Sequence, residues 1–199
     1  MFRAVIVVLI AFWIGAIPFG YIIAKKSKGI NIQEYGSGNI GSTNVRRVVG
    51  KKEALQTQVL DIGKGLLPTL VVMQLEGNNW LTTGADQLIL LVAFATILGH
   101  DFTPFLRFKG GKGVNTTVGA CLVVAPIATI IATIIYYVGK KLGKHVSVGS
   151  LLIAISLPLL YFLQHGSTNT FFFLVGAGFL IVLRHKSNIS RLIAGRENQ

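Results

Sequence analysis

The chain has 199 residues, of which 52% are hydrophobic and only 13% are charged. In soluble domains about a quarter of all residues are charged, so this composition excludes an ordinary soluble protein and predicts an integral membrane protein. The net charge of +12 is spread over short connections, which leaves no basic domain long enough to bind nucleic acid. The single cysteine, Cys121, lies in an apolar run, so neither a disulfide framework nor a thiolate metal site is expected.

Six apolar runs follow one another, at about residues 4–24, 54–75, 87–106, 114–138, 149–164 and 168–184. Several approach the ~20 residues needed to cross the ~30 Å hydrocarbon core of a bilayer. The first run lacks a small-residue cleavage site and is expected to be a retained helix and not a signal peptide. No repeat, low-complexity tract or linker interrupts the series, so residues 1–199 are expected to form a single domain.

The connections between these runs alternate sharply in charge. Residues 25–53 carry seven Lys or Arg, and the connections 107–115 and 139–148 and the tail beyond residue 183 are also basic. The connections 76–86 and 165–168 contain no Lys or Arg. The positive-inside rule therefore predicts that the basic connections lie in the cytoplasm.

Run 114–138 would then have cytoplasmic connections at both of its ends. Pro126 lies at its midpoint, where a proline breaks a helix, so two half-helices of about eleven residues that enter and return would satisfy the charges. The predicted fold is an all-α integral membrane protein with seven helical segments, two of them short and re-entrant around Pro126. The N-terminus is predicted to be external and the C-terminus cytoplasmic.

The first cytoplasmic connection contains Gly36-Ser37-Gly38-Asn39-Ile40-Gly41-Ser42-Thr43-Asn44-Val45-Arg46-Arg47. Backbone turned by glycines, small hydroxyl and amide side chains and two arginines form a surface suited to an anion and a polyol. The plainer interpretation is a solvated loop with a helix cap at Ser42, Thr43 or Asn44.

The second basic connection reads Arg107-Phe108-Lys109-Gly110-Gly111-Lys112-Gly113-Val114-Asn115, with three cations, three glycines and no acid. Glycine lets backbone N–H groups approach an anion closely, and lysine adds mobile positive charge, so a phosphate site is predicted here. It is not a Walker A loop, because Gly113 follows Lys112 and a membrane helix precedes the loop. A juxtamembrane anchor for anionic lipid would explain the lysines but not the glycines.

Two further cytoplasmic patches carry polar side chains. In the tail, His185 and Asn188 are three residues apart and would face the same way on a helix. Ser147 and Ser150 lie at the start of an apolar run, where a hydroxyl is either a binding group or a simple helix N-cap.

Ionisable residues inside the membrane are functional candidates by default. Asp61 and Lys64, three residues apart within the second run, form either a neutralising structural pair or part of a site. His100 and Asp101 precede Pro104 and either act as an acid–base pair or order the following loop. The sequence lacks a Cys/His metal cluster, a G-x-S-x-G nucleophile elbow and the H-x-x-x-x-D signature of the common glycerolipid acyltransferases.

Several of these motifs, taken in order, resemble the bacterial acyl-phosphate-dependent glycerol-3-phosphate acyltransferases, the PlsY family. They are Ser37 to Asn44 with Arg46-Arg47, Asp61-Ile62-Gly63-Lys64-Gly65, Gly99-His100-Asp101-Phe102, Phe108 to Val114, Ser147-Val148-Gly149-Ser150, and His185 to Leu192. The resemblance covers nearly the whole chain. The sequence departs from the family pattern at Asp101-Phe102-Thr103-Pro104, where a shorter His-Phe-Pro run is more usual.

The resemblance implies transfer of a fatty acyl group from acyl phosphate to the 1-hydroxyl of glycerol 3-phosphate. The products are lysophosphatidic acid and inorganic phosphate, and no metal or other cofactor is used. It further implies a multi-pass protein of the bacterial cytoplasmic (inner) membrane with its site facing the cytoplasm. The partners implied are the two substrates, membrane lipid and, functionally coupled, the enzyme that makes acyl phosphate.

On the matched motifs, the catalytic residues are expected to be His185, Asn188, Lys112 and Ser37. The substrate-binding residues are expected to be Gly38, Asn39, Gly41, Ser42, Thr43, Asn44, Arg46, Arg47, Lys64, His100, Lys109, Gly110, Gly111, Gly113, Ser147, Ser150 and Arg191. Either His185 or a substrate phosphate, with a second pKa near ~6, takes the hydroxyl proton.

Two other functions remain open from the sequence. The break expected at Pro126 is typical of a membrane transporter for anions or glycerol phosphate, whose site is built from broken helices. Against a transporter, the basic and glycine-rich motifs are all predicted to lie on the cytoplasmic side of the membrane, and no inverted repeat is visible in the sequence. A non-catalytic lipid-binding subunit is the third interpretation.

Overall fold

The computed structural model describes residues 2–77 and 85–197, and every regular element within them is a helix. These residues fall into two compact units, Met1–Ala120 and Cys121–Gln199. The first contains α1 (Phe2–Ala16), α2 (Phe19–Lys28), η1 (Ile32–Glu34), α3 (Ser42–Val48), α4 (Lys51–Gly77), α5 (Ala85–Asp101) and η2 (Pro104–Leu106). Helix α6 (Val114–Val124) begins in the first unit, and α7 (Pro126–Leu142), α8 (Val146–His165), α9 (Asn169–Arg184) and α10 (Lys186–Ile193) belong to the second. The all-helical prediction is confirmed for the described residues, whereas the single domain stays a prediction.

Prolines divide two of the predicted apolar runs. Pro126 is the first residue of α7, directly after the short helix α6, so the predicted break is confirmed at that residue. The second half-helix runs on to Leu142 and is longer than expected. Run 4–24 is also interrupted, at Pro18 between α1 and α2, because proline has no N–H to continue the helical ladder.

Within the described residues, three helices are long and apolar enough to cross a membrane, by length and composition alone. They are Phe2–Lys28, taken as one span through Pro18, Gln87–Leu106 and Val146–His165. The bent pair α9 and α10 makes a fourth if it is counted as one span. Residues 78–84 of the predicted external connection lie outside the described part of the chain.

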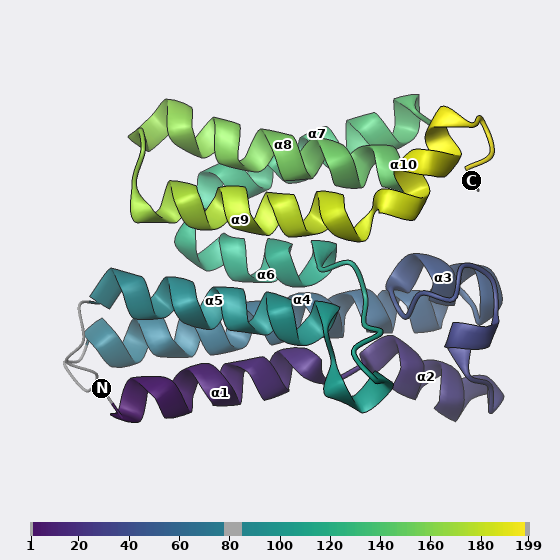
Figure 1. The fold of residues 1–199 in the computed structure, drawn as a ribbon, viewed down its shortest axis with the longest axis horizontal. Coiled ribbons are helices and arrows are strands. Elements are labelled where there is room, and N and C mark those ends of the chain that lie inside the picture. The colour runs from purple at the N-terminus through teal and green to yellow at the C-terminus, as the bar shows by residue number, and fades with distance from the viewer. Residues whose placement is uncertain (1, 78–84, 198–199) are drawn as a thin grey trace. The chain divides into compact units, whose positions relative to one another are not determined.

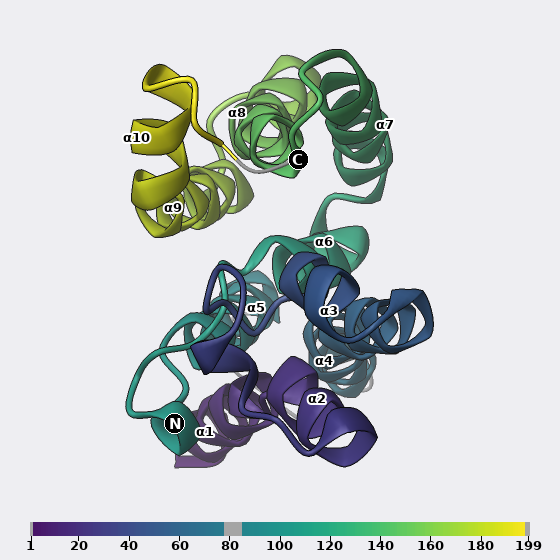
Figure 2. The same cartoon turned by 90° about the vertical axis from the view of Figure 1, so that its right-hand side faces the viewer.

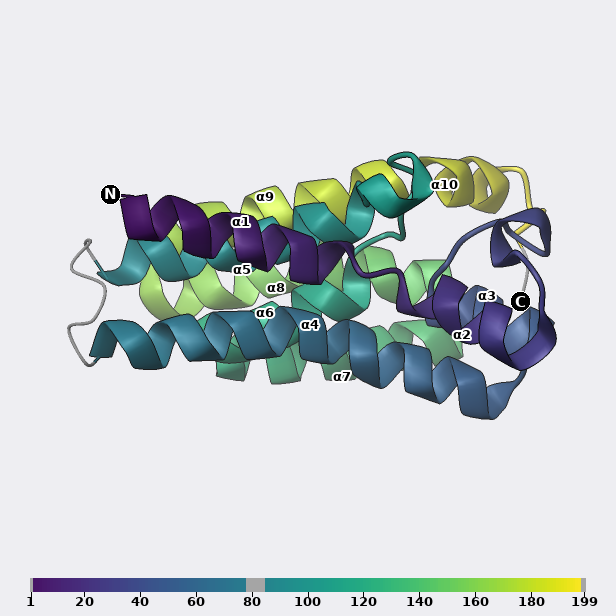
Figure 3. The same cartoon turned by 90° about the horizontal axis from the view of Figure 1, so that it is seen from below.

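In the first unit, α1, α4 and α5 run lengthwise beside one another (Figure 1; Figure 3). The crossing of α1 and α5 is close because small residues meet there. A Cβ on Gly15 would lie 2.2 Å from the Thr96 carbonyl oxygen, and one on Gly99 would lie 2.2 Å from that of Phe12. Such small residues let membrane helices approach backbone to backbone.

The basic connections of the first unit, all of them described, gather at one end of its helices. Helices α2 and α3, the start of α4 and the end of α5 all lie at that end (Figure 1). The amide of Gln33 donates to the Lys109 carbonyl oxygen at 3.0 Å, and the amide of Asn115 donates to the Ser42 hydroxyl at 3.2 Å. The two predicted anion-binding loops are therefore neighbours in the folded chain.

In the second unit, α7, α8 and α9 pack side by side and α10 turns away from the end of α9 by 59° (Figure 2). Close backbone approach recurs here, since a Cβ on Gly178 would lie 2.4 Å from the Ala154 carbonyl oxygen. The α7–α8 connection and α10 lie at the same end of this unit (Figure 1). This end carries Ser147, His185 and Asn188, all of them buried.

Candidate functional site

The loop before α3 is held in shape by the buried side chain of Asn44. Its Oδ1 accepts from the Ser37 backbone N–H at 3.0 Å. Its Nδ2 donates to the carbonyl oxygens of Tyr35 at 3.0 Å and Asn39 at 2.9 Å. Because these bonds connect residues on both sides of Gly38, whose φ is +68°, Asn44 fixes the path of the whole segment 35–44.

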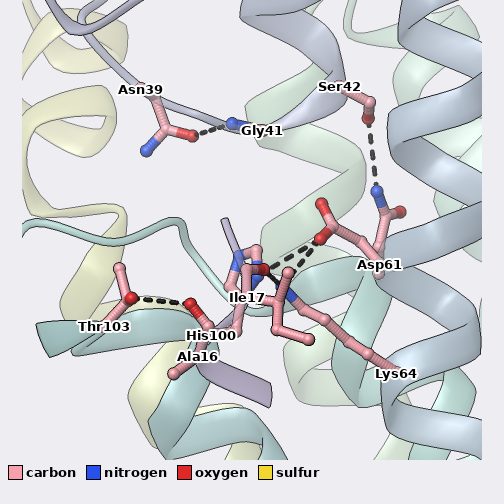
Figure 4. Close-up of polar contacts among 10 residues, drawn as sticks. Ala16, Ile17, Asn39, Gly41, Ser42, Asp61, Lys64, His100 and Thr103 are labelled. Atoms are coloured by element: carbon pink, nitrogen blue, oxygen red, sulfur yellow. Dashed lines mark hydrogen bonds and ion pairs between the residues drawn. The ribbon is translucent and has the colours of Figure 1, made fainter. Parts of the chain in front are cut away.

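The loop carries several polar side chains near the start of α3. Asn39 Oδ1 accepts from the Gly41 N–H at 2.8 Å, which turns the chain into the helix (Figure 4). Ser42 and Thr43 are half-buried in the first turn, whereas Ser37 is exposed. Arg46 and Arg47 lie exposed in the last turn of α3, so the segment presents hydroxyls, an amide and two cations.

The glycine loop between η2 and α6 packs tightly on the end of α5. A Cβ on Gly110 would lie 2.1 Å from the His100 carbonyl oxygen, and one on Gly111 would lie 1.9 Å from His100 Nε2. The Gly111 N–H donates to the His100 carbonyl oxygen at 3.1 Å. Gly113 has φ +72° and lies beside both oxygens of Asp101, which would be 3.0 and 3.3 Å from a Cβ there. Neighbouring backbone and side chains of the same chain therefore leave no room for a side chain at positions 110 and 111 and little at 113, which is one reason why these residues are glycines.

Two cations flank these glycines. Lys109 is exposed and Lys112 is half-buried. Arg107 and Phe108, just before them, both adopt positive φ values, of 52° and 62°. That backbone conformation is uncommon outside glycine and is a sparsely populated state held by the surrounding structure.

Behind the loop, α4 and α5 contribute a buried charged cluster, drawn in Figure 4. Lys64 Nζ lies 2.8 Å from Asp61 Oδ1 and donates to the Ile17 carbonyl oxygen at 2.9 Å. His100 Nδ1 lies 3.6 Å from the same Asp61 oxygen. With Asp101, all four side chains belong to residues that are at most 4% exposed. The Asp61–Lys64 pair predicted from the i, i+3 spacing is confirmed.

The polar end of the second unit centres on Glu197. Its carboxylate accepts from Asn188 Nδ2 and from Arg191 Nε at 2.8 Å. Burial alone would raise the pKa of the Glu197 carboxyl, but the hydrogen bonds from Asn188, Arg191 and Ser147 hold that pKa below its usual value. The tail after α10 is thereby tied to α10 and to the first turn of α8.

His185 lies buried at the junction of α9 and α10, with Nδ1 2.8 Å from the Ile181 carbonyl oxygen. A carbonyl only accepts, so Nδ1 carries a proton in this contact, and in the neutral form of the ring the lone pair is then on Nε2. Ser150 donates to the Val146 carbonyl oxygen at 3.0 Å, which is a helix-internal contact. Among the described residues, no group of three or more His, Cys, Asp or Glu could hold a metal ion.

Comparison with known proteins gives these features a family. The sequence model for glycerol-3-phosphate acyltransferase matches residues 5–195. The glycerol-3-phosphate acyltransferase of Clostridium acetobutylicum is 42% identical over 99% of this chain and all of that protein. The chain belongs to the glycerol-3-phosphate acyltransferase family. The Aquifex aeolicus member is 35% identical over 99% of each chain.

Two solved structures resemble this family member closely. Both are crystal structures of PlsY, an integral membrane glycerol 3-phosphate acyltransferase, in its glycerol 3-phosphate form and in its lysophosphatidic acid form. Each is 34% identical and covers 99% of this chain and 95% of the solved one, with TM-scores of 0.91 and 0.88. At that identity and coverage, the integral membrane architecture predicted from composition is supported by a solved fold.

The structure of this acyltransferase family member divides the predicted site residues between its two units. In the first, Ser37 to Asn44, Arg46, Arg47 and Lys109 to Gly113 lie at the same end, with His100 and Lys64 buried behind them. In the second, Ser147, Ser150, His185, Asn188 and Arg191 lie together around the α8 and α10 starts. Sequence reasoning missed Glu197, because nothing in its spacing marks a residue six positions beyond Arg191 as the partner of three site residues.

Proposed function

We propose that this chain catalyses transfer of an acyl group from acyl phosphate to the 1-hydroxyl of glycerol 3-phosphate, releasing lysophosphatidic acid and inorganic phosphate. The observation that carries the proposal is the near full-length match, at a TM-score of 0.91, to an acyltransferase solved in its glycerol 3-phosphate form. Membership of the glycerol-3-phosphate acyltransferase family makes the reaction class plain. The proposal adds acyl phosphate as the donor.

Acyl phosphate suits the charge distribution of the described residues. It is a mixed anhydride with a good leaving group, so positioning and charge stabilisation supply much of the rate. In the step, the 1-hydroxyl oxygen bonds to the acyl carbonyl carbon, and the carbon–oxygen bond to phosphate breaks. Phosphate leaves with the bonding electron pair, and the hydroxyl proton passes to it or to His185.

In the first unit, the exposed and half-buried cations would neutralise substrate phosphate. Lys112 and Lys109 flank the glycines, and Arg46 and Arg47 lie on the neighbouring helix at the same end of the unit. We assign Lys112 to a phosphate and Ser37 to the reacting oxygen, because Ser37 is exposed while its backbone is fixed by Asn44. Gly38, Asn39, Gly41, Ser42 and Thr43 would line the substrate from the same loop.

In the second unit, His185 is proposed as the base or as an orienting group. In the neutral form of His185 the Ile181 contact assigns the proton to Nδ1 and the lone pair to Nε2, and this is the tautomer in which Nε2 acts as a base. Asn188 is oriented by Glu197, and Arg191 shares that carboxylate. Ser147 and Ser150 remain proposed substrate ligands.

The direct test is release of inorganic phosphate from acyl phosphate by purified protein, with and without glycerol 3-phosphate. Phosphate release that depends on glycerol 3-phosphate is expected, and Lys112→Ala should lower it by at least about a hundredfold. Lys141→Ala is the matched control, because Lys141 is an exposed lysine in the last turn of α7. Near wild-type turnover by Lys112→Ala would refute the phosphate assignment of the loop.

A transporter of glycerol phosphate is the competing function, since helix breaks such as the one at Pro126 also build transporter sites. Vesicles loaded with labelled glycerol 3-phosphate decide between the two. Counter-transport of the label without any acyl donor would support the transporter, and turnover without transport supports the enzyme.

We further propose that the N-terminus is external, that the C-terminus and the site face the cytoplasm, and that α6 and α7 form a re-entrant pair within seven helical segments of one domain. This topology is supported by the basic connections of each unit, which share one end of its helices (Figure 1). We also propose that the protein lies in the bacterial inner membrane and that an enzyme that makes acyl phosphate supplies its donor substrate. Labelling of a cysteine introduced at Lys144 from the external side would overturn it.

A further inference from the structure

The glycine loop is shaped by the end of α5 and not by its own sequence alone. The His100 ring lies against the Cα of Gly111, with Nε2, Cε1 and Cδ2 all within 2.9 Å of where a Cβ would be. The His100 carbonyl oxygen accepts from the Gly111 N–H. One residue therefore holds Gly111 through both its backbone and its side chain.

The next residue, Asp101, holds the other end of the same loop. Its two carboxylate oxygens lie beside Gly113, the residue directly before α6. Carboxylates near the first turn of a helix are favourable, because the helix dipole is positive there. His100 and Asp101 together thus define where Lys112, between the two contacts, leaves the loop.

His100 is fixed in turn from behind. Asp61 lies 3.6 Å from its Nδ1 and 2.8 Å from Lys64 Nζ. Lys64 is itself anchored to the Ile17 carbonyl oxygen, where α1 ends, and lies over the Phe19 ring. The chain of contacts therefore runs from the α1–α2 joint through α4 to the glycine loop.

Packing alone does not explain this buried cluster. Replacing a buried ion pair by apolar side chains of similar volume is often neutral or stabilising for a protein. A cluster that lies directly behind a ligand loop has a second use, since supporting contacts decide whether a site keeps its productive geometry.

We propose that His100 and Asp101 are positioning residues for acyl transfer: they hold Gly110 to Gly113 in the path that presents Lys112 to a substrate phosphate, and Asp61 and Lys64 fix His100. The proposal rests on the proposed function of the loop as a phosphate site. A substrate contact for His100 is not required by it, because the ring's position against Gly111 is sufficient.

A double-mutant cycle on His100 and Gly111 tests the contact itself. Gly111→Ala places a methyl group where the imidazole lies, so the loop must shift. The KM for one of the two substrates, the one whose phosphate the loop holds, should then rise roughly tenfold. His100→Ala should raise the same KM and leave KM for the second substrate unchanged. In the His100→Ala background the methyl group has room, so Gly111→Ala should add less than about a threefold change.

The double-mutant cycle distinguishes the positioning role of His100 from a direct clash between the Gly111 methyl group and the substrate. If the Gly111 methyl group acted by striking the substrate directly, its full effect on KM would persist in the His100→Ala background. Effects that simply multiply, or an unchanged KM in His100→Ala, would overturn the proposal. His165→Ala is the control for loss of a histidine, because His165 is exposed at the far end of α8.

A binding readout distinguishes positioning from general destabilisation. Saturating glycerol 3-phosphate or acyl phosphate should raise the Tm of the wild-type protein in detergent, since ligands stabilise the state they bind. His100→Ala and Asp101→Asn should keep most of the unliganded Tm but lose the shift given by one of these ligands. Retention of both shifts would refute the role. Should His100→Ala not fold, Asp101→Asn keeps the volume of its side chain and should also raise that one KM; an unchanged KM would again refute the role.

Failure of the proposed function gives a different pattern. If the wild-type protein shows no phosphate release that depends on glycerol 3-phosphate, the proposed function is contradicted. If Lys112→Ala is fully active, the phosphate assignment of the loop is contradicted. An active wild type that needs Lys112, together with His100 and Asp101 variants of normal KM and ligand shift, contradicts only the positioning role.

Discussion

Replacing Asn44 with alanine should disorder the loop that carries Ser37 and Asn39. The buried Asn44 side chain makes three hydrogen bonds of 2.9 to 3.0 Å, to the Ser37 N–H and the carbonyl oxygens of Tyr35 and Asn39. A fourth, to Ile32, is long at 3.4 Å and adds little. At about 1 kcal/mol for each good bond, Asn44→Ala should lower the free energy of unfolding by about 3 kcal/mol.

Two other substitutions calibrate this value. Asn39→Ala removes a single bond, to the Gly41 N–H, and should cost about 1 kcal/mol. Asn44→Asp keeps the acceptor for Ser37 but turns a carboxylate oxygen toward two carbonyl oxygens, so it should destabilise at least as much as alanine does. Denaturant-induced unfolding in detergent, followed by circular dichroism, measures all three. An Asn44→Ala loss no larger than that of Asn39→Ala would refute the assignment of Asn44 as the organiser of the loop.

Two further predictions concern the carboxylate of Glu197 in the tail and the contacts between helices. Because the folded pKa of Glu197 is lowered, its contribution to stability is complete above the unfolded pKa of about 4.3 and disappears as the pH falls through the folded value. Glu197→Gln should therefore lower the Tm at pH 7 and flatten its acid dependence; an unchanged Tm–pH curve would contradict this. On α4, a Cβ at Gly65 would lie 2.1 Å from the Thr116 carbonyl oxygen, whereas Gly63 has open space. Gly65→Ala should destabilise by about 1–3 kcal/mol and Gly63→Ala should be neutral or stabilising; equal effects would disprove the close contact.

The helices were largely predictable because apolar length and proline chemistry are local properties. The run 114–138 was expected to break at Pro126, and α7 begins at that residue, although Pro68 and Pro158 lie inside the continuous helices α4 and α8. The start of the first half-helix at Val114 was also predicted and is confirmed. The interruption at Pro18 was missed, since a run of apolar residues was read as one helix although the same chemistry operates there.

Partners distant in sequence were much less predictable. The i, i+3 spacing on a helix predicts the contact between Asp61 and Lys64. No spacing rule predicts the hydrogen bond from Lys64 to the carbonyl oxygen of Ile17, 47 residues away. The glycines of the 107–115 loop show the same limit. A glycine signals that something approaches the backbone closely, and sequence cannot say whether that neighbour is a ligand or, as for Gly111, a histidine of the same chain.

The position of Asp101 changes how the loop is expected to bind a phosphate. The N-terminal end of α6 offers about half a positive charge, and the carboxyl oxygens of Asp101 already lie beside Gly113 at that end. A substrate phosphate carries about 1.5 to 2 negative charges. Half a positive charge cannot balance them, so in the proposed site the neutralisation comes from Lys112, Lys109 and the α3 arginines. Because cations and not the dipole then hold the phosphate, removal of a single lysine should have a larger effect on binding than any change to the first turn of α6.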